Sequence, residues 1–246
     1  MVSANTTDRF LDGRVVVKQP AAGFRAGLDA VMLAAAVPVR AGGDALELGA
    51  GAGTASLCVA KRVEGARVTG VEIDVALTLL ANNNAKANGM AEHVTFAAAD
   101  ALALPAHLRR PFDHVFCNPP FHGEDGEAPP DEAKARAVQD QGKLSAWITA
   151  GVKRTVSGGT FTLILRADRL AEALAALPDR GLTIFPLWPR RDEPAKRVLL
   201  QLRQGAKTPL RVLPGLTLHE ADGKYTPEAD AVLRQGASLA LESPRL

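Results

Sequence analysis

Four consecutive residues, Asn-Pro-Pro-Phe, stand at the end of an apolar run that is typical of a buried strand. Asn118 carries a carboxamide oxygen that accepts hydrogen bonds, and Pro119 offers a backbone carbonyl whose direction the proline rings restrict. Two such acceptors can hold both N–H groups of an amine and localise its lone pair. Phe121 offers a ring face for a stacked base. Asn118, Pro119, Pro120 and Phe121 are therefore candidate catalytic residues for transfer to an exocyclic base amine, although two prolines can also simply end a strand.

A second candidate site lies upstream, where Gly49, Ala50, Gly51 and Gly53 form a loop between a predicted strand and a predicted helix. Small residues there let the backbone and the helix N-terminus approach a ligand. The spacing is Gly-x-Gly-x-Gly, whereas dinucleotide-binding enzymes use Gly-x-Gly-x-x-Gly. Glu47 precedes the loop, and its carboxylate suits a cofactor with an amine and a sulfonium but repels a pyrophosphate. The loop therefore favours S-adenosylmethionine over a nicotinamide dinucleotide.

Further carboxylates end the next two strands along the chain. Glu72 can accept hydrogen bonds from both hydroxyls of a ribose, whereas Asp74 better suits the competing role of helix cap. Asp100, followed by Ala101, can accept from an adenine amino group or be an ordinary loop acid. The carboxyl ends of parallel strands meet at one edge of a sheet. We therefore expect Glu47, the glycines, Glu72, Asp100 and Ala101 to bind the cofactor, with Asn118 beside its methyl group.

The elements that would position these residues alternate along the chain. Strands are predicted at 44–48, 67–73, 94–98, 112–117, 160–165, 182–187 and 197–203, and helices at 54–63, 75–88, 144–156 and 167–177. This alternation predicts a doubly wound, Rossmann-like α/β sheet of seven strands that is mostly parallel. The last two strands are separated by a loop too short for a helical crossover, so we expect an antiparallel pair near the C-terminus. Without a linker or a repeat, residues 1–246 are predicted to form a single domain.

Composition limits the class of protein without naming a partner. Of 246 residues, 47% are apolar and 23% are charged, and the net charge is +2, as in ordinary globular proteins. The chain lacks a signal-peptide pattern and an apolar run of the roughly 20 residues that span a bilayer. Cys58 and Cys117 stand in apolar surroundings, which predicts reduced core thiols and a cytoplasmic protein. No His, Cys and carboxylate set has metal-ligand spacing, so no metal is expected.

The charges are distributed unevenly. Residues 151–211 contain 12 Lys/Arg and 5 Asp/Glu, a net charge of +7, and the rest of the chain carries −5. We expect this segment to present a basic surface that docks RNA, with a solvated basic face as the plainer alternative. Aromatic residues make up 4% of the chain, which argues against the stacking platforms of single-strand-binding proteins.

Three motifs in this order, LELGAGAGTASL, GVEID and NPPF, resemble the class I S-adenosylmethionine-dependent methyltransferases of the small-domain (MTS) group. The N-terminal run VVVKQPAAGFRAGLDAVMLAAAV and the tail LTLHEADGKYTPEADAVL are similar to the bacterial tRNA1(Val) (adenine-N6)-methyltransferase family. The resemblance covers about residues 10–233. It implies N6 of an adenine in tRNA as the methyl acceptor. It also implies that Gly27 and Asp29, in an N-terminal motif segment at 1–40, help to close the cofactor site.

The match departs from the family around the Asn-Pro-Pro-Phe motif. Phe121 stands where the family often has Tyr, and the following segment keeps Arg136 but lacks a His-Glu pair. NPPFHG also resembles guanine-N2 methyltransferases of ribosomal RNA. A small-molecule O-methyltransferase is a further alternative, although an oxygen nucleophile needs a base or metal that the sequence does not show. Alternatives from other classes are an NAD-dependent oxidoreductase and a catalytically inactive RNA-binding protein that keeps the cofactor for structure.

Overall fold

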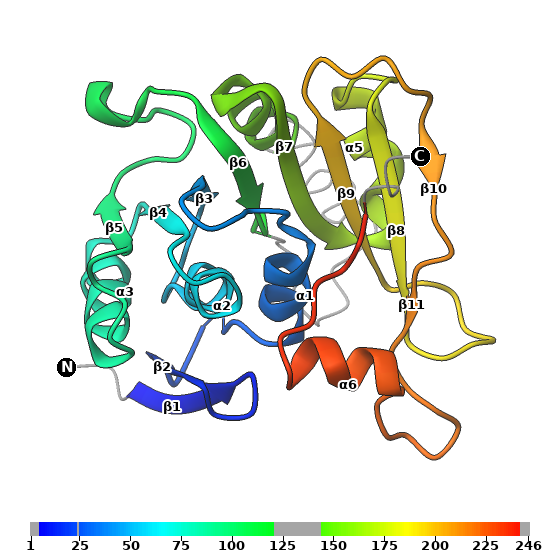
Figure 1. The fold of residues 1–246 in the computed structure, drawn as a ribbon, viewed down its shortest axis with the longest axis horizontal. Helices are drawn as coiled ribbons and strands as arrows, with labels where there is room; N and C mark the ends of the chain where they lie inside the picture. Colours follow the sequence, from blue (N-terminus) through cyan, green and yellow to red (C-terminus); the bar gives the residue numbers. More distant parts are fainter. Residues whose placement is uncertain (1–4, 24, 121–143, 242–246) are drawn as a thin grey trace, which may run out of the picture.

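The structure, a computed structural model, describes residues 5–23, 25–120 and 144–241. Within these ranges, seven long strands form a central sheet, and the two-residue strands β10 (Arg211–Val212) and β11 (Leu216–Thr217) extend it along β8 (Figure 1). The long strands are β3 (Asp44–Leu48), β4 (Arg67–Glu72), β5 (Val94–Ala98), β6 (Phe112–Cys117), β7 (Thr155–Arg166), β8 (Leu182–Trp188) and β9 (Arg197–Arg203).

The long strands follow the order β5-β4-β3-β6-β7-β9-β8 across the sheet. Neighbouring strands from β5 to β7 are parallel, whereas β9 is antiparallel to both β7 and β8. The predicted doubly wound sheet, mostly parallel with an antiparallel strand near the C-terminus, is confirmed. The order reverses between β3 and β6, which is the position where open α/β sheets bind ligands.

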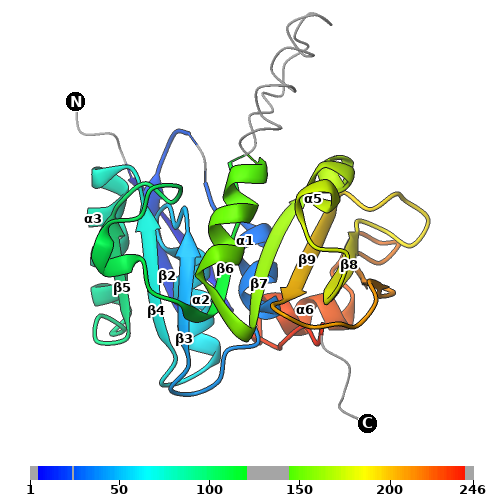
Figure 2. The same cartoon turned by 90° about the horizontal axis from the view of Figure 1, so that it is seen from above.

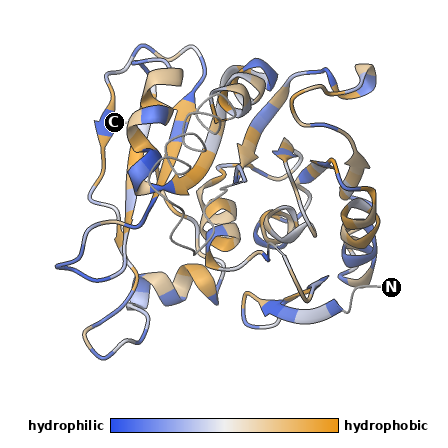
Figure 3. Ribbon diagram, turned by 180° about the vertical axis from the view of Figure 1, so that it is seen from behind, coloured by the Kyte–Doolittle hydropathy of each residue, from blue (hydrophilic) through white to orange (hydrophobic). Residues whose placement is uncertain are grey.

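Helices cover both faces of this sheet (Figure 2). On one face α1 (Leu28–Ala36), α2 (Thr54–Arg62) and α3 (Val75–Ala87) bury one apolar cluster. On the other face helical residues 144–154 and α5 (Leu170–Ala176) bury a second cluster. The strands of the central sheet are predominantly apolar because helices cover both of its faces. By contrast, β1 (Asn5–Phe10), which lies outside this sheet, is predominantly hydrophilic (Figure 3).

Local sequence explains where the helices near the site begin and end. Asp74 caps α3, because its carboxylate accepts hydrogen bonds from the N–H groups of Ala76 and Leu77 at 2.7 and 3.1 Å. Gly89 follows α3 with a φ of +70°, a left-handed conformation that favours glycine. The capping role predicted for Asp74 is therefore confirmed.

The region after residue 144 differs from the prediction. The helix predicted to reach residue 156 ends at 154, because Thr155 pairs with Phe112 and begins β7. Gly158 and Gly159 lie inside β7, where the register to β6 shifts, instead of forming a turn between helix and strand. The helix predicted at 167–177 divides into the 3₁₀ turn η2 (Ala167–Arg169) and α5.

Two further elements lie at the chain ends: the N-terminal hairpin was not predicted, whereas the resemblance of the tail to the family implies a helix there. An antiparallel hairpin of β1 (Asn5–Phe10) and β2 (Val15–Pro20) lies beside α3, and α6 (Pro227–Leu233) lies beside α1 (Figure 1). The hairpin turn contains Leu11 and Asp12 at positive φ, followed by Gly13 at +81°. The remaining short element is η1 (Ala106–Leu108).

Both cysteines are buried and unpaired, as predicted for core thiols. Burial raises the pKa of the Cys58 thiol to about 12, which keeps it protonated and unreactive at neutral pH. Among the described residues, no helix combines the length and apolar character needed to cross a membrane.

Candidate active site

The carboxyl ends of three adjacent strands bring the predicted site residues together. Leu48, the last residue of β3, pairs with Val71 of β4 and with Cys117 of β6. Gly49, Glu72 and Asn118 directly follow these three paired residues along the chain, so they lie at the same edge of the sheet. The sheet register therefore assembles the loop, the strand-ending acid and the carboxamide that the sequence separates by about 70 positions.

The three glycines of the loop have positive φ angles of 71°, 55° and 87°, but their surroundings differ. A Cβ added to Gly49 would lie 2.6 Å from Cη2 of Trp147, and one added to Gly53 would lie 2.6 Å from Cζ of Phe96. At Gly51 the added Cβ would have no atom of the described residues within 4 Å. Gly49 and Gly53 are thus required by packing, and Gly51 faces the space that a ligand can occupy.

Hydrogen bonds to β4 hold this loop in place. The N–H groups of Gly49 and Ala50 both donate to the carbonyl of Val71 at 2.9 Å. Glu72 accepts from the Gly51 N–H at 2.8 Å through Oε2 and from the Asp74 N–H at 3.0 Å through Oε1. Each carboxylate oxygen retains a further lone pair, so Glu72 can support the loop and accept ligand hydroxyls together.

Glu47 is directed to the beginning of α2. Its carboxyl is 3% exposed and accepts hydrogen bonds from Ser56 N–H at 3.0 Å and from the Ser56 hydroxyl. Burial raises the pKa of Glu47 to about 8, against the opposing effect of these hydrogen bonds. In the structure Glu47 therefore fixes the first turn of α2 below the loop, and its attraction for a charged cofactor stays a prediction.

The next strand end contributes a polar and an apolar group. Asp100 is exposed, and its Oδ1 accepts from Leu102 N–H at 2.8 Å; Ala101 between them is buried. Leu102 is 46% exposed, and Ile73, directly after Glu72, is 70% exposed. Sequence reasoning missed both residues, although a large apolar residue within two positions of a strand-ending acid is a readable signal. They provide apolar surface beside two hydrogen-bond acceptors.

Asn118 differs from the other polar groups of the site. Its Oδ1 atom is buried and receives no hydrogen bond from the described residues, a state shared in that part of the chain only by the hydroxyls of Thr6 and Thr54. Leaving such an acceptor unpaired costs about 1–3 kcal/mol, so it calls for a functional explanation. Pro119 is buried and Pro120 is exposed. Phe121, predicted to stack a base, lies outside the described residues, as do His122 and residues 123–131.

Trp147 is a second residue that the sequence reasoning missed. It belongs to helical residues 144–154, is half-buried, and packs its indole against Gly49. Because Gly49 and Asn118 follow paired residues of β3 and β6, the indole lies near the junction of the glycine loop and the Asn-Pro-Pro turn. An aromatic residue in a predicted helix ordinarily packs in a core, so the sequence carried no specific signal for this position.

Gly27 and Asp29 stand at the start of α1 and have different surroundings. The Asp29 carboxylate forms an ion pair with Arg197 at 2.8 Å, and Arg197 begins β9 opposite Arg166, the last residue of β7. Asp29 therefore reaches the same sheet edge as Asn118. Gly27 is exposed and has no side chain within 4 Å of an added Cβ among the described residues.

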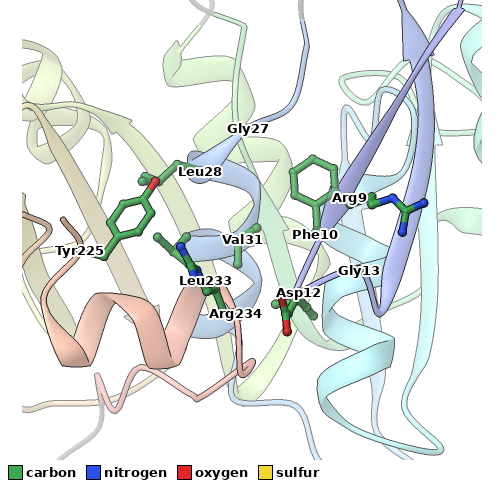
Figure 4. A pocket seen from close by; sticks show the side chains of 11 residues that line it. Arg9, Phe10, Asp12, Gly13, Gly27, Leu28, Val31, Tyr225, Leu233 and Arg234 are labelled. Carbon is green, nitrogen blue, oxygen red and sulfur yellow. The ribbon is translucent and has the colours of Figure 1, made fainter. Parts of the chain in front are cut away.

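Gly27 also lines a cavity of about 490 Å³ on the outer side of α1. Figure 4 shows Phe10 of β1 and Tyr225 of the C-terminal segment on opposite sides of α1 at this cavity. The residues that line it include none of the glycine loop, Glu72 or Asn118. The cavity is therefore distinct from the site at the sheet edge.

The basic segment 151–211 divides between two edges of the sheet. Strands β7 and β9 are antiparallel, so the end of β7 at Arg166 and the start of β9 at Arg197 lie at one edge of the sheet. Six of the twelve cations lie near that edge, and the other six lie near the opposite edge. Several cations at the edge of the sheet that holds Gly49, Glu72 and Asn118, here called the active edge, form ion pairs with acids, as Arg190 does with Glu193. Arg191 and Lys196 are exposed there and form no ion pair with the described residues. RNA docking by this segment stays a prediction, and the loop 189–196 is the part of the segment that carries these two cations.

Known proteins that are similar to this chain carry the names of methyltransferases. A family model described as methyltransferase small domain (MTS) matches residues 23–144. The tRNA1(Val) (adenine(37)-N6)-methyltransferase of Porphyromonas gingivalis is 30% identical over 239 residues, which cover 90% of this chain and 92% of the relative.

Two solved structures are similar in fold. A predicted O-methyltransferase from Agrobacterium tumefaciens matches with a TM-score of 0.72 at 28% identity, over 86% of this chain and 98% of that protein. A geranyl diphosphate methyltransferase in complex with S-adenosylmethionine matches with a TM-score of 0.52 at 16% identity, over 71% of this chain and 84% of that protein. The second likeness concerns the fold alone.

Proposed function

This chain belongs to the small-domain (MTS) family of S-adenosylmethionine-dependent methyltransferases, and from that premise we propose that it methylates an exocyclic base amine, N6 of an adenine in tRNA. The methyltransferase activity and the cofactor follow from the family. The base and the RNA are the proposed part. The observation that carries the proposal is Oδ1 of Asn118, which is buried at this edge of the sheet and has no hydrogen-bond partner among the described residues.

The cofactor would lie across the carboxyl ends of β3, β4 and β5, and it would supply an electrophilic methyl group on its sulfonium. Gly51 offers the open approach for its amino-acid end, and Glu72 offers acceptors for the ribose hydroxyls. Asp100 offers an acceptor for the adenine amine, and the exposed apolar surfaces of Ile73 and Leu102 suit the two faces of the adenine ring. The residues present therefore fit S-adenosylmethionine.

The proposed chemistry at Asn118 follows from what an aromatic amine lacks. Its nitrogen lone pair is delocalised into the base, so the amine is a weak nucleophile. Asn118 Oδ1 and the Pro119 carbonyl would each accept one of its N–H groups and favour a tetrahedral nitrogen with a localised lone pair. This pair of acceptors also stabilises the positive charge that develops on nitrogen, and the proton leaves afterwards. Positioning and electrostatics are thus the contributions of this turn.

The RNA substrate is supported by two observations. The Porphyromonas gingivalis relative, which matches 90% of this chain, is named as a tRNA methyltransferase, and the loop 189–196 places the exposed cations Arg191 and Lys196 at the same edge of the sheet as Asn118. Such cations can contact phosphates on either side of a base held at Asn118. We propose that this loop contributes to RNA docking.

A second candidate function is O-methylation of a small molecule, which the name of the similar Agrobacterium tumefaciens protein suggests. The described geometry favours the amine, because a hydroxyl has one hydrogen to donate and the turn offers two acceptors. A phenol or alcohol would leave one of the acceptors unpaired.

The deciding experiment is incubation of the purified protein with total tRNA and methyl-labelled S-adenosylmethionine, followed by nucleoside analysis. The proposal expects labelled N6-methyladenosine, and tRNA from a strain that lacks this protein should accept more label than tRNA from its parent. Label in N2-methylguanosine would move the target to guanine. A methylated oxygen, or labelled small molecules with unlabelled RNA, would refute the proposal.

A further inference from the structure

The N-terminal hairpin is attached to α3 by two asparagine side chains. Asn88 accepts from the Val16 N–H through Oδ1 at 2.9 Å and donates to the Val16 carbonyl through Nδ2 at 2.7 Å. Asn84 makes the same pair of bonds with Lys18, at 2.9 Å each. Each carboxamide therefore pairs with one residue of β2 as a neighbouring strand would.

Repeat distances explain why this attachment works. Residues four apart on a helix are separated by about 6 Å along its axis, and residues two apart on a strand by about 6.6 Å. The two asparagines on α3 thus match Val16 and Lys18 on the edge of β2 that faces away from β1. The helix satisfies backbone groups that an edge strand otherwise leaves unpaired.

The two asparagines differ in one contact. The Nδ2 atom of Asn84 also donates to the carbonyl of Ala52 at 2.9 Å, inside the glycine loop, whereas the second bond of Asn88 Nδ2 goes to the Asn84 carbonyl of the same helix. Asn84 is 2% exposed, so water does not compete for its bonds. One buried carboxamide therefore links the N-terminal hairpin to the loop that faces the cofactor.

We propose that Asn84 is a positioning residue that couples docking of the N-terminal hairpin to the conformation of the cofactor loop. This inference rests on the proposed placement of S-adenosylmethionine against Gly51, the residue before Ala52. It gives a physical route by which the N-terminal segment 1–40 acts on the cofactor site without reaching the ligand. By linkage, bound cofactor must favour the docked hairpin by the same factor by which the docked hairpin raises cofactor affinity.

The test compares Asn84→Ala with the matched control Asn88→Ala. Both variants remove one pair of hydrogen bonds between α3 and β2, and only Asn84→Ala also removes the bond to Ala52. Calorimetric titration with S-adenosylhomocysteine measures the loop, and thermal unfolding measures general damage. We expect both variants to lower Tm. The dissociation constant should rise roughly 5- to 20-fold in Asn84→Ala, the range for losing one or two hydrogen bonds, and less than about 2-fold in Asn88→Ala.

Hydrogen exchange on the unmodified protein provides a measurement that does not depend on how the variants fold. The amides of Val16 and Lys18 should exchange more slowly when S-adenosylhomocysteine is bound, although neither residue contacts the proposed ligand site. In Asn84→Ala that response should be lost, and in Asn88→Ala the response at Lys18 should persist.

The coupling would be overturned if the two variants bound S-adenosylhomocysteine with equal affinity. It would also be overturned if the ligand left the exchange rates of the Val16 and Lys18 amides unchanged in the unmodified protein. Failure of the unmodified protein to bind S-adenosylhomocysteine would instead refute the cofactor site itself. The two failures are therefore distinguishable.

Discussion

The two sides of the active edge differ in how completely their polar groups are paired before a ligand binds. On the proposed cofactor side, the glycine loop donates to Val71 and Glu72, Asp74 donates to Glu72, and Ser56 donates to Glu47. On the proposed amine side, Oδ1 of Asn118 is buried and lacks a donor among the described residues. The hydroxyl of Thr54, which follows the loop at the start of α2, is also buried without a partner among the described residues, so the contrast concerns the loop amides and the strand-ending acids.

The difference corresponds to two physical tasks. A loop that binds through its backbone and a carboxylate can be built complete, because each carboxylate oxygen accepts a second hydrogen bond from the ligand. An acceptor that must act on a developing positive charge stabilises that charge most strongly when no protein donor shares its lone pairs. Mutations on the cofactor side should therefore change affinity, and mutations on the amine side should change rate.

The largest effect is expected from Asn118→Ala, which removes one of two acceptors for the amine and leaves the glycine loop intact. The rate of tRNA methylation in single turnover should fall on the order of 10²-fold, because the lost interaction is strongest in the transition state. Calorimetry should show nearly unchanged S-adenosylmethionine affinity. A variant that loses affinity and keeps its rate would reverse the assignment of the two sides.

Next in size is Glu72→Ala, which removes the predicted ribose acceptors and the acceptor for Gly51 N–H. Hydrogen bonds to a charged group contribute about 1.5–3 kcal/mol, so affinity for S-adenosylhomocysteine should fall roughly 10- to 100-fold. Glu72→Gln retains one acceptor oxygen, so its affinity for S-adenosylhomocysteine should lie between those of Glu72→Ala and the unmodified protein. Calorimetric affinities equal to that of the unmodified protein would remove Glu72 from the cofactor site.

Two glycine variants separate packing from ligand approach. Gly53→Ala should lower Tm, because the new Cβ meets the Phe96 ring at a positive φ. Gly51→Ala shares the backbone strain but meets no described atom, so its larger effect should be on cofactor affinity, about tenfold by titration. The comparison fails if Gly51→Ala is the less stable variant and binds cofactor normally.

Glu47 predicts how stability depends on pH. Burial raises its pKa from 4.5 to about 8, so between these values the folded protein holds a proton that the unfolded chain has lost. Unfolding free energy should therefore fall as pH rises through this window, and Glu47→Gln should flatten the trend. The Tm measured at pH 5 and at pH 8 reports this difference, because Tm shifts by about 2–4 °C per kcal/mol of unfolding free energy for a chain of this size. Parallel curves for the two proteins would contradict the assignment.

The smallest effect is expected at the loop 189–196. Arg191→Glu with Lys196→Glu should weaken tRNA binding a few-fold and reduce its salt dependence, since fewer counterions are released. Lys153→Glu with Lys207→Glu changes the same charge at the opposite edge of the sheet and is the matched control. Equal salt slopes in both double variants would return Arg191 and Lys196 to the role of solvated surface cations.

Much of the fold could be predicted because its signals are local. The strand runs, the cap at Asp74 and the glycine at 89 each depend on neighbouring residues, and the structure bears them out. The misplaced start of β7 had a non-local cause, because the pairing of Thr155 with Phe112 is invisible to a helical pattern. The N-terminal hairpin escaped prediction for the same reason: β2 is attached to asparagines of α3 about 70 residues away.

The sequence by itself determined the class of chemistry, since residue types and spacing at Glu47–Gly53, Glu72 and Asn118–Phe121 specify a loop, an acid and an acceptor turn. Tertiary structure decided which of these groups are already paired. It turned Glu47 toward Ser56, gave Glu72 a second task at Gly51, and left Asn118 Oδ1 without a donor among the described residues. The physical reason is that hydrogen-bond satisfaction depends on distances between segments far apart in the chain, which a local pattern cannot encode.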